Sequence, residues 1–243
     1  MDDDQTRLAS FAVGGGGAGA FLPGGVLAAR ERMLYGKKQL WQSLGVSFSM
    51  NTGTLLQRLE VIGNHGSVSE IDVEVGESRY YDPETLVFLC EKELDELAET
   101  NRIGKAFQLR LEDLLAEEET GHVLSAGYMC VVDSSTGNTF LLGYLASLYG
   151  DLELYLDLDS EKLIYMSGSV GEMEQYLGAV PWHHEVCADT FARYLDLQYV
   201  ELGGTTSFGG MYALVDPEDP EGLSAPFWVE AQNGWASMGV MPY

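Results

Sequence analysis

The middle of this chain carries a strict alternation of apolar and polar residues, which restricts it to a β-sheet. The segment ELYLDLD (153–159) places its three leucines on one face. The other face carries Glu153, Tyr155, Asp157 and Asp159. Only an extended strand, in which successive side chains point to opposite sides, separates residues in this way. We therefore expect a strand with one buried face and one acidic face.

The neighbouring segments predict partners for this strand. YMCVVD (128–133) and TFLLGYLA (139–146) flank a turn of Ser, Thr, Gly and Asn, and we expect them to pair as a hairpin. KLIYMS (162–167) follows a short turn as the next strand. Ser169 is then expected to cap a helix that carries Val170, Met173, Tyr176 and Leu177.

Two helices are predicted ahead of this sheet. The Asp-Pro pair at 82–83 begins a helix that runs to about residue 99, because Asp is a preferred N-cap and Pro a preferred first helical residue. A second, acidic helix is expected over 105–119. The alternating segment VSEIDVEV (68–75) predicts one more strand upstream.

The last third of the chain predicts a helix and further strands. The helix is expected at about 184–195. An Asn-Gly pair at 233–234 is a strong signal for a two-residue hairpin turn. The strands are expected within 197–202, 211–216, 226–232 and the segment WASMGVM (235–241).

These elements predict an α+β fold with an antiparallel or mixed sheet and helices packed on one face. The strands fall within 127–167 and 197–241. Residues 1–25 are glycine-rich and are expected to be a flexible lead-in. Residues 26–180 are expected to form the α+β domain. Residues 181–243 either extend the same sheet or form a small second lobe.

The charge of the chain excludes several classes of partner. It holds 38 Asp and Glu residues against 13 Lys and Arg, a formal net charge of −25. Beyond residue 121 the only basic residues are Lys162 and Arg193. Such a surface repels nucleic acid phosphates and anionic lipids and attracts basic proteins over long distances. We expect a basic protein partner, no nucleic acid and no membrane. Acidity that serves only solvation is the alternative interpretation.

Cysteine usage and the N-terminus predict a cytoplasmic protein. Cys90, Cys130 and Cys187 are odd in number, form no CxxC pair and lie in apolar or mixed stretches, which is typical of reduced thiols. The chain opens with three aspartates, whereas a signal peptide has a basic start. No stretch approaches 18 uninterrupted apolar residues.

The sequence predicts no cofactor and contains one cluster of metal-capable side chains, HHEVCAD (183–189). His183 and Cys187 have the i, i+4 spacing that places two zinc ligands on one helical face. A second arm of ligands is missing from the sequence. A metal-dependent hydrolase centred on these residues is therefore kept as an alternative to an ordinary helix start.

Other side chains are candidates for a partner-binding surface. Glu153, Asp157 and Asp159 share one face of the predicted strand. Trp228 and Trp235 flank the predicted hairpin turn, where they either pack into the fold or form an exposed pair that anchors an interface. No arrangement of Ser, His and Asp suggests a catalytic triad.

The segment GNTFLLGYLASLYGDLELYLDLDSEKLIYMSGSVGEMEQYL (137–177) resembles the core of the SUKH superfamily, which includes bacterial toxin-immunity proteins. The similar elements are a strand with LLGYL, a hairpin LYLDLDSEKLIYM around an acidic turn, and the Ser-capped helix SVGEMEQYL. The resemblance implies that residues 26–180 form a SUKH-like α+β domain that binds another protein without catalysis. For bacterial members it implies neutralisation of a toxin, often a basic nuclease.

The leading hypothesis is therefore a non-enzymatic, acidic protein-binding module of the immunity type. Its carboxylates would face a basic toxin surface and occlude it.

Overall fold

The structure is a computed structural model that describes residues 53–64, 66–71, 83–117, 124–133, 135–171 and 183–242. The predicted glycine-rich lead-in (1–25) and most of the predicted helix after Ser169 lie outside these residues. None of the described helices is both long and apolar enough to cross a bilayer.

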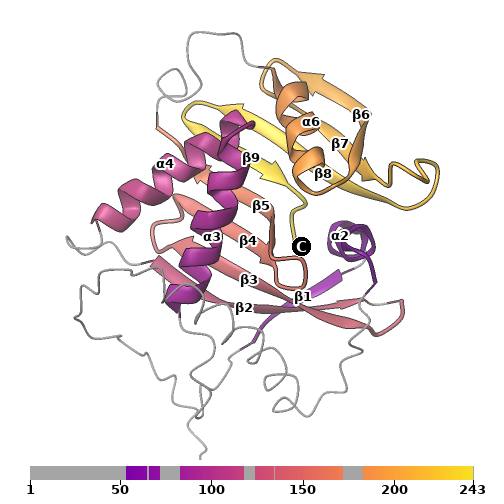
Figure 1. The fold of residues 1–243 in the computed structure, drawn as a ribbon, viewed down its shortest axis with the longest axis horizontal. Helices are drawn as coiled ribbons and strands as arrows, with labels where there is room; N and C mark the ends of the chain where they lie inside the picture. The colour runs from indigo at the N-terminus through magenta and orange to yellow at the C-terminus, as the bar shows by residue number, and fades with distance from the viewer. Residues whose placement is uncertain are drawn as a thin grey trace, which may run out of the picture.

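A nine-stranded sheet organises the described part of the molecule (Figure 1). The strand order is β1-β2-β3-β4-β5-β9-β8-β7-β6, and every neighbouring pair is antiparallel. The strands are β1 (Gly66–Ile71), β2 (Leu124–Asp133), β3 (Thr139–Ser147), β4 (Leu152–Asp157), β5 (Lys162–Ser169), β6 (Gln198–Thr206), β7 (Gly209–Val215), β8 (Ser224–Gln232) and β9 (Trp235–Gly239). The strands of the last third of the chain thus continue the sheet that the middle third begins.

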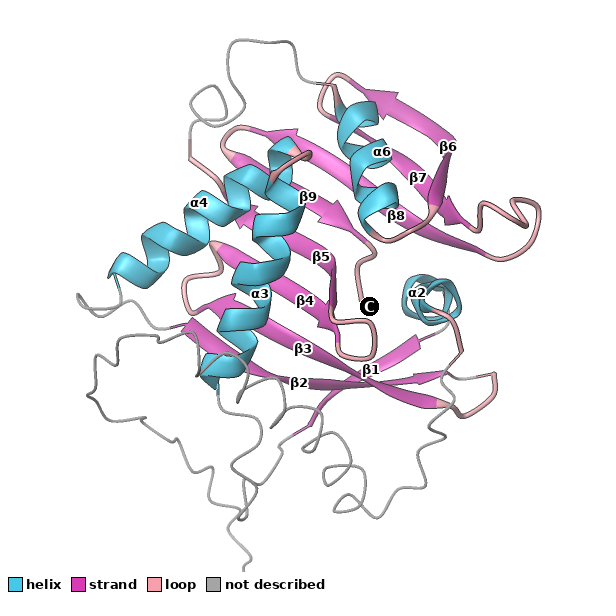
Figure 2. Cartoon of the chain, viewed as in Figure 1, coloured by secondary structure: helices cyan, strands magenta, loops and turns pink. Residues whose placement is uncertain are grey.

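Four described helices pack against this sheet (Figure 2). They are α2 (Leu55–Asn64), α3 (Pro83–Ala98), α4 (Arg102–Glu117) and α6 (His184–Tyr194). Helices α3, α4 and α6 lie in front of the sheet in Figure 1, and α3 contacts both of the others. We call the side they cover the helical face and the opposite side the second face.

Helix α3 approaches the sheet closely because a glycine lies beneath it. A Cβ atom at Gly143 in β3 would lie 2.7 Å from Cδ2 of Leu86 in α3, closer than real Cβ atoms come to other atoms. Gly143 is paired with Leu156 of β4. Because directly paired residues of antiparallel strands share a face, Leu156 also points toward the helices. Leu86 and Leu156 are both buried in the core.

Helix α2 contacts the second face. It packs on β8 and β1, and a Cβ at Gly63 would meet the ring of Pro226 at 3.0 Å. Pro226 is followed on β8 by Phe227, whose ring packs against Phe191 of α6 on the helical face. Because neighbouring residues of a strand point to opposite sides, Pro226 and α2 belong to the second face.

The predicted fold class, α+β with an antiparallel sheet and packed helices, is confirmed. The predicted start of the second helix is wrong by three residues, since α4 begins at Arg102 and not at Lys105. The reason is that Oδ1 of Asn101 accepts hydrogen bonds from the backbone N–H groups of Ile103 (3.0 Å) and Gly104 (3.1 Å). This cap begins the helix at Arg102.

Candidate acidic and aromatic patch on the sheet

The strand register aligns a row of polar residues across the second face. Glu153 of β4 is paired with Ser167 of β5, Ser167 with Ser237 of β9, and Ser237 with Glu230 of β8. Directly opposed residues in antiparallel strands point to the same side of the sheet. The row therefore places two carboxylates, Glu153 and Glu230, on one face.

The next row of the sheet shows that this is the face away from α3, α4 and α6. Leu154, Met166, Met238 and Val229 are paired in the same order across β4, β5, β9 and β8. All four side chains are fully buried, as expected for residues beneath the helices. The polar row alternates with this apolar row, so it occupies the second face.

Trp228 and Trp235, the two tryptophans proposed as interface anchors from the sequence, lie on the second face. Trp228 precedes Glu230 by two residues on β8, and Trp235 is paired with Gln232 on the same strand. Their side chains are 42% and 44% exposed. Trp228 is paired with Gly239, four residues from Trp235, so the backbone positions of the two residues are separated by about 13 Å along the strand direction. Glu230 lies between them.

We refer to Glu153, Trp228, Glu230 and Trp235 as the acidic–aromatic patch. It brings together three residues that the sequence singled out separately. Glu153 is half-buried and accepts a hydrogen bond from the hydroxyl of Tyr155 at 2.5 Å. Burial and the neighbouring Glu153 both raise the pKa of Tyr155, so the tyrosine keeps its proton and holds the carboxylate in place. Glu230 was not predicted, although its position between the tryptophans in a strand pattern was a usable signal.

Asp157 does not belong to this patch, and the prediction that it faces a partner is wrong. Its side chain is 1% exposed and is paired with Arg58 of α2. Oδ1 accepts a hydrogen bond from Nε of Arg58 at 2.8 Å, and Oδ2 accepts one from Nη2 at 2.6 Å. Oδ2 also accepts the backbone N–H and the hydroxyl of Ser160. The carboxylate is therefore a structural element that ties α2 to the end of β4.

Asp159 is exposed in the turn between β4 and β5. It lies two residues beyond the buried Asp157, and its charge contributes to raising the pKa of Arg58. Glu153, Asp157 and Asp159 thus do not form the single acidic face that the alternation predicted, because Asp157 is covered and Asp159 lies beyond the end of β4.

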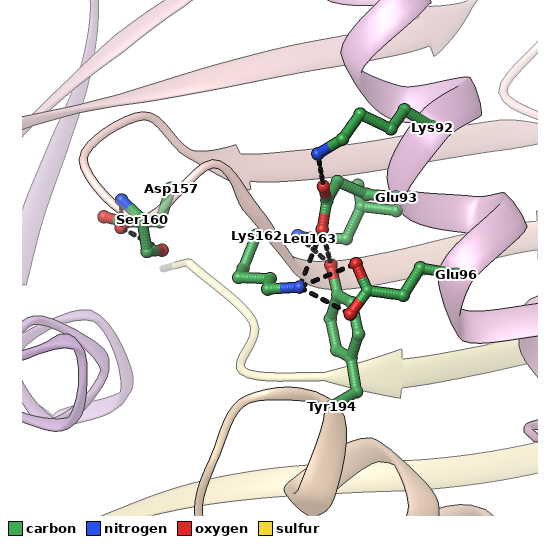
Figure 3. Close-up of polar contacts among 8 residues, drawn as sticks. All are labelled: Lys92, Glu93, Glu96, Asp157, Ser160, Lys162, Leu163 and Tyr194. Carbon is green, nitrogen blue, oxygen red and sulfur yellow. Dashed lines mark hydrogen bonds and ion pairs between the residues drawn. The ribbon is translucent and has the colours of Figure 1, made fainter.

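Lys162, the first residue of β5, belongs to a second, partly buried network (Figure 3). Its Nζ lies 3.2 Å from Glu93 and 2.8 Å from Glu96, both on α3. The hydroxyl of Tyr194 donates to Glu93 at 2.9 Å and accepts the backbone N–H of Leu163 at 2.8 Å. Burial and the charge of Glu93 raise the pKa of Tyr194, which keeps it protonated. This network joins α3, β5 and the end of α6.

The metal-capable cluster of α6 is divided between the core and the surface. His183 precedes the helix in an extended conformation and is exposed, whereas Cys187 is buried in the core. Burial raises the pKa of the Cys187 thiol, which disfavours the thiolate that a metal requires. His184 is buried against Tyr212, with Nδ1 and Oη 2.5 Å apart. Among the described residues, no three His, Cys, Asp or Glu side chains gather as metal ligands.

A second acidic surface lies between α3 and α4. A groove of about 410 Å³ is lined by Glu91, Asp95 and Glu112 together with one basic residue, Lys92, and by apolar side chains that include Leu94 and Leu111. Burial and the charges of Asp95 and Glu112 raise the pKa of Glu91. Negative charge is therefore present on both sides of the sheet, but among the described residues exposed tryptophans accompany it only on the second face.

No protein-family model, no curated protein and no solved structure matches the chain.

Proposed function

We propose that this chain is a non-enzymatic module that binds a basic partner protein through the acidic–aromatic patch. The observation that carries the proposal is the alignment of Glu153 and Glu230 on the face that exposes Trp228 and Trp235. Tryptophan is enriched among the residues that dominate binding energy at protein interfaces. Its ring also attracts Lys and Arg side chains, and the carboxylates supply opposite charge.

The overall charge supports the same choice of partner. A net charge of −25 accelerates the encounter with a basic protein, and the acceleration falls as salt rises. Strands β8 and β9 contain no Lys or Arg, so the described patch offers its carboxylates without an internal counter-charge from those strands.

The finer proposal is an immunity-type role, in which the patch occludes a basic toxin such as a nuclease. It is supported by the resemblance of residues 137–177 to the SUKH superfamily, a segment that includes β3, β4 and β5. Occlusion needs no catalytic group, because a bound acidic surface blocks the path of an anionic substrate.

The test is capture of partner proteins by the immobilised full chain at about 50 mM and about 500 mM salt, with identification by mass spectrometry. We expect a basic protein at low salt and much less of it at high salt. The double variant Glu153→Gln/Glu230→Gln should capture less of the same protein. Glu218→Gln/Glu221→Gln removes the same charge from the exposed loop between β7 and β8 and should leave capture unchanged. If both variants capture as much of the basic protein as the original chain does, the acidic residues serve solvation and not binding.

A further inference from the structure

The outer edge of the sheet at β6 is open. β6 is the last strand in the order and pairs only with β7 among the described strands (Figure 1). Seven of its nine residues are exposed and the other two are partly exposed. One row of its main-chain N–H and C=O groups therefore has no strand partner in the described part of the chain. Such an edge is a template for an additional strand.

The sequence of β6 lacks two common protections of an edge strand. QYVELGGTT contains neither Lys nor Pro, residues that discourage pairing with another strand. Two irregularities, between Glu201 and Gly203 and between Gly203 and Thr206, limit the regular ladder. The regular edge is thus Gln198–Glu201, in which each residue has a direct partner on β7.

The two sides of this edge differ in chemistry. Val200 is paired with Ala213, which is paired with Pro226, so Val200 points to the second face. Its side chain is 46% exposed. Tyr199 and Glu201 point to the helical face, where Tyr199 contacts the ring of Tyr212 edge-on.

Carboxylates surround the helical side of the edge. The pKa of Tyr199 is raised by partial burial and then by the charges of Asp189 and Glu185, both on α6, and of Glu201. Arg193 lowers it, and because its Nη2 is paired with Asp189 at 2.5 Å, the arginine offsets only one of these three carboxylates. The helical side is therefore negative, and the opposite side is apolar at Val200.

We propose that β6 accepts an extended segment of another protein as a tenth strand, and that this segment alternates basic and apolar residues. Main-chain hydrogen bonds to Gln198–Glu201 would hold the segment. Its basic side chains would lie on the side of Glu201, Glu185 and Asp189, and its apolar side chains would lie beside Val200. Because successive side chains of a strand point to opposite sides, a segment that fits both sides of this edge must alternate basic and apolar residues.

Charge favours such a segment over a second copy of the chain. Two copies would each bring a net charge of −25, and each would bring its own Glu201 to the shared edge. Like charges on adjacent strands destabilise the pairing. The site uses residues other than those of the acidic–aromatic patch, so each can fail without the other.

The test uses the full chain and a fluorescent eight-residue peptide of alternating Lys and Val with blocked ends, followed by fluorescence anisotropy. We expect saturable binding that is at least about tenfold weaker for Val200→Lys, which places a charge on the apolar side of the edge. Leu148→Lys adds the same charge at an exposed residue in the turn between β3 and β4 and should bind within about twofold of the original chain. Equal thermal unfolding of the two variants excludes misfolding as the cause.

Two matched peptides separate strand addition from simple charge attraction. A peptide with four Val followed by four Lys keeps the charge but loses the alternation. A peptide with alternate backbone nitrogens methylated keeps the side chains but loses main-chain donors. Both should bind at least about tenfold more weakly than the alternating peptide. Equal binding of the block peptide, no binding of the alternating one, or concentration-dependent self-association that Val200→Lys abolishes would each overturn the proposal.

Discussion

Arg58 and Asp157 form a two-pronged ion pair between α2 and the end of β4, with Nε–Oδ1 and Nη2–Oδ2 distances of 2.8 and 2.6 Å. Both side chains are buried. Burial lowers the pKa of Arg58, but the hydrogen bond and the charge of Asp157 raise it by more, so the guanidinium stays charged. A buried pair of this kind is costly to break, because removing one partner leaves the other charge uncompensated.

Arg58→Met should therefore destabilise the protein by about 3–5 kcal/mol, measured by urea unfolding. Arg58→Met/Asp157→Leu should recover most of that loss, because no buried charge remains. The control is Arg193→Met, which breaks an ion pair whose arginine is 73% exposed and should cost less than about 1 kcal/mol. A loss for Arg58→Met no larger than the control's would contradict the assignment.

Tyr194→Phe removes one hydroxyl from the network in Figure 3. The backbone N–H of Leu163 loses its acceptor and Glu93 loses a donor, both in the core. We expect a loss of about 1–3 kcal/mol in the free energy of unfolding. Tyr199→Phe is the matched change, since the described residues provide no hydrogen-bond partner for that hydroxyl, and it should be close to neutral.

Asp133 should account for part of the loss of stability at acidic pH. Side-chain hydrogen bonds from Thr136 and Ser135 lower its pKa from 3.8 to about 2. Because the folded pKa lies below the unfolded one, the ionised group stabilises the fold above pH ~4, and this stabilisation is lost as the pH falls toward about 2. The difference in unfolding midpoint between the original chain and Asp133→Asn should be constant above pH ~5 and shrink toward pH ~2. A difference that does not change with pH would rule out this origin.

The three cysteines should differ in reactivity. Burial and the charges of Glu91 and Glu93 raise the pKa of Cys90 to about 12, and burial also raises the pKa of Cys130 and Cys187. All three are free, and Cys130 is the one that is only partly buried. Alkylation of the folded protein at pH ~8, followed by peptide mass spectrometry, should modify Cys130 first. Modification of Cys90 before Cys130 would contradict the described core.

The alternation in ELYLDLD predicted β4 correctly but misassigned Asp157. A period of two identifies which side chains share a face, and it carries no information about what covers that face. Arg58, the residue that pairs with Asp157, lies 99 positions away in α2, a helix that the sequence analysis did not predict. The partner of a buried charge at that distance is set by tertiary packing.

The hairpin strands and the Asn-Gly turn were predictable because their signals are local. The observed β2, β3 and β8 contain the predicted segments, although β2 begins four residues before its predicted start, and β9 ends two residues before its predicted end. The acidic–aromatic patch was only half predictable. Trp228 and Trp235 could be recognised from their positions around the turn. Their alignment with Glu153 depends on the pairing of β5 with β9, which joins segments about 70 residues apart.

Calorimetric titration of the basic protein expected from the capture experiment with Trp228→Ala/Trp235→Ala tests whether the acidic–aromatic patch is the binding surface. If the acidic–aromatic patch is the binding surface, the dissociation constant should rise at least about 100-fold, because two exposed anchors are lost. Leu148→Ala/Leu223→Ala truncates two comparably exposed apolar residues elsewhere and should stay within about twofold. An unchanged dissociation constant for the tryptophan variant would contradict the account.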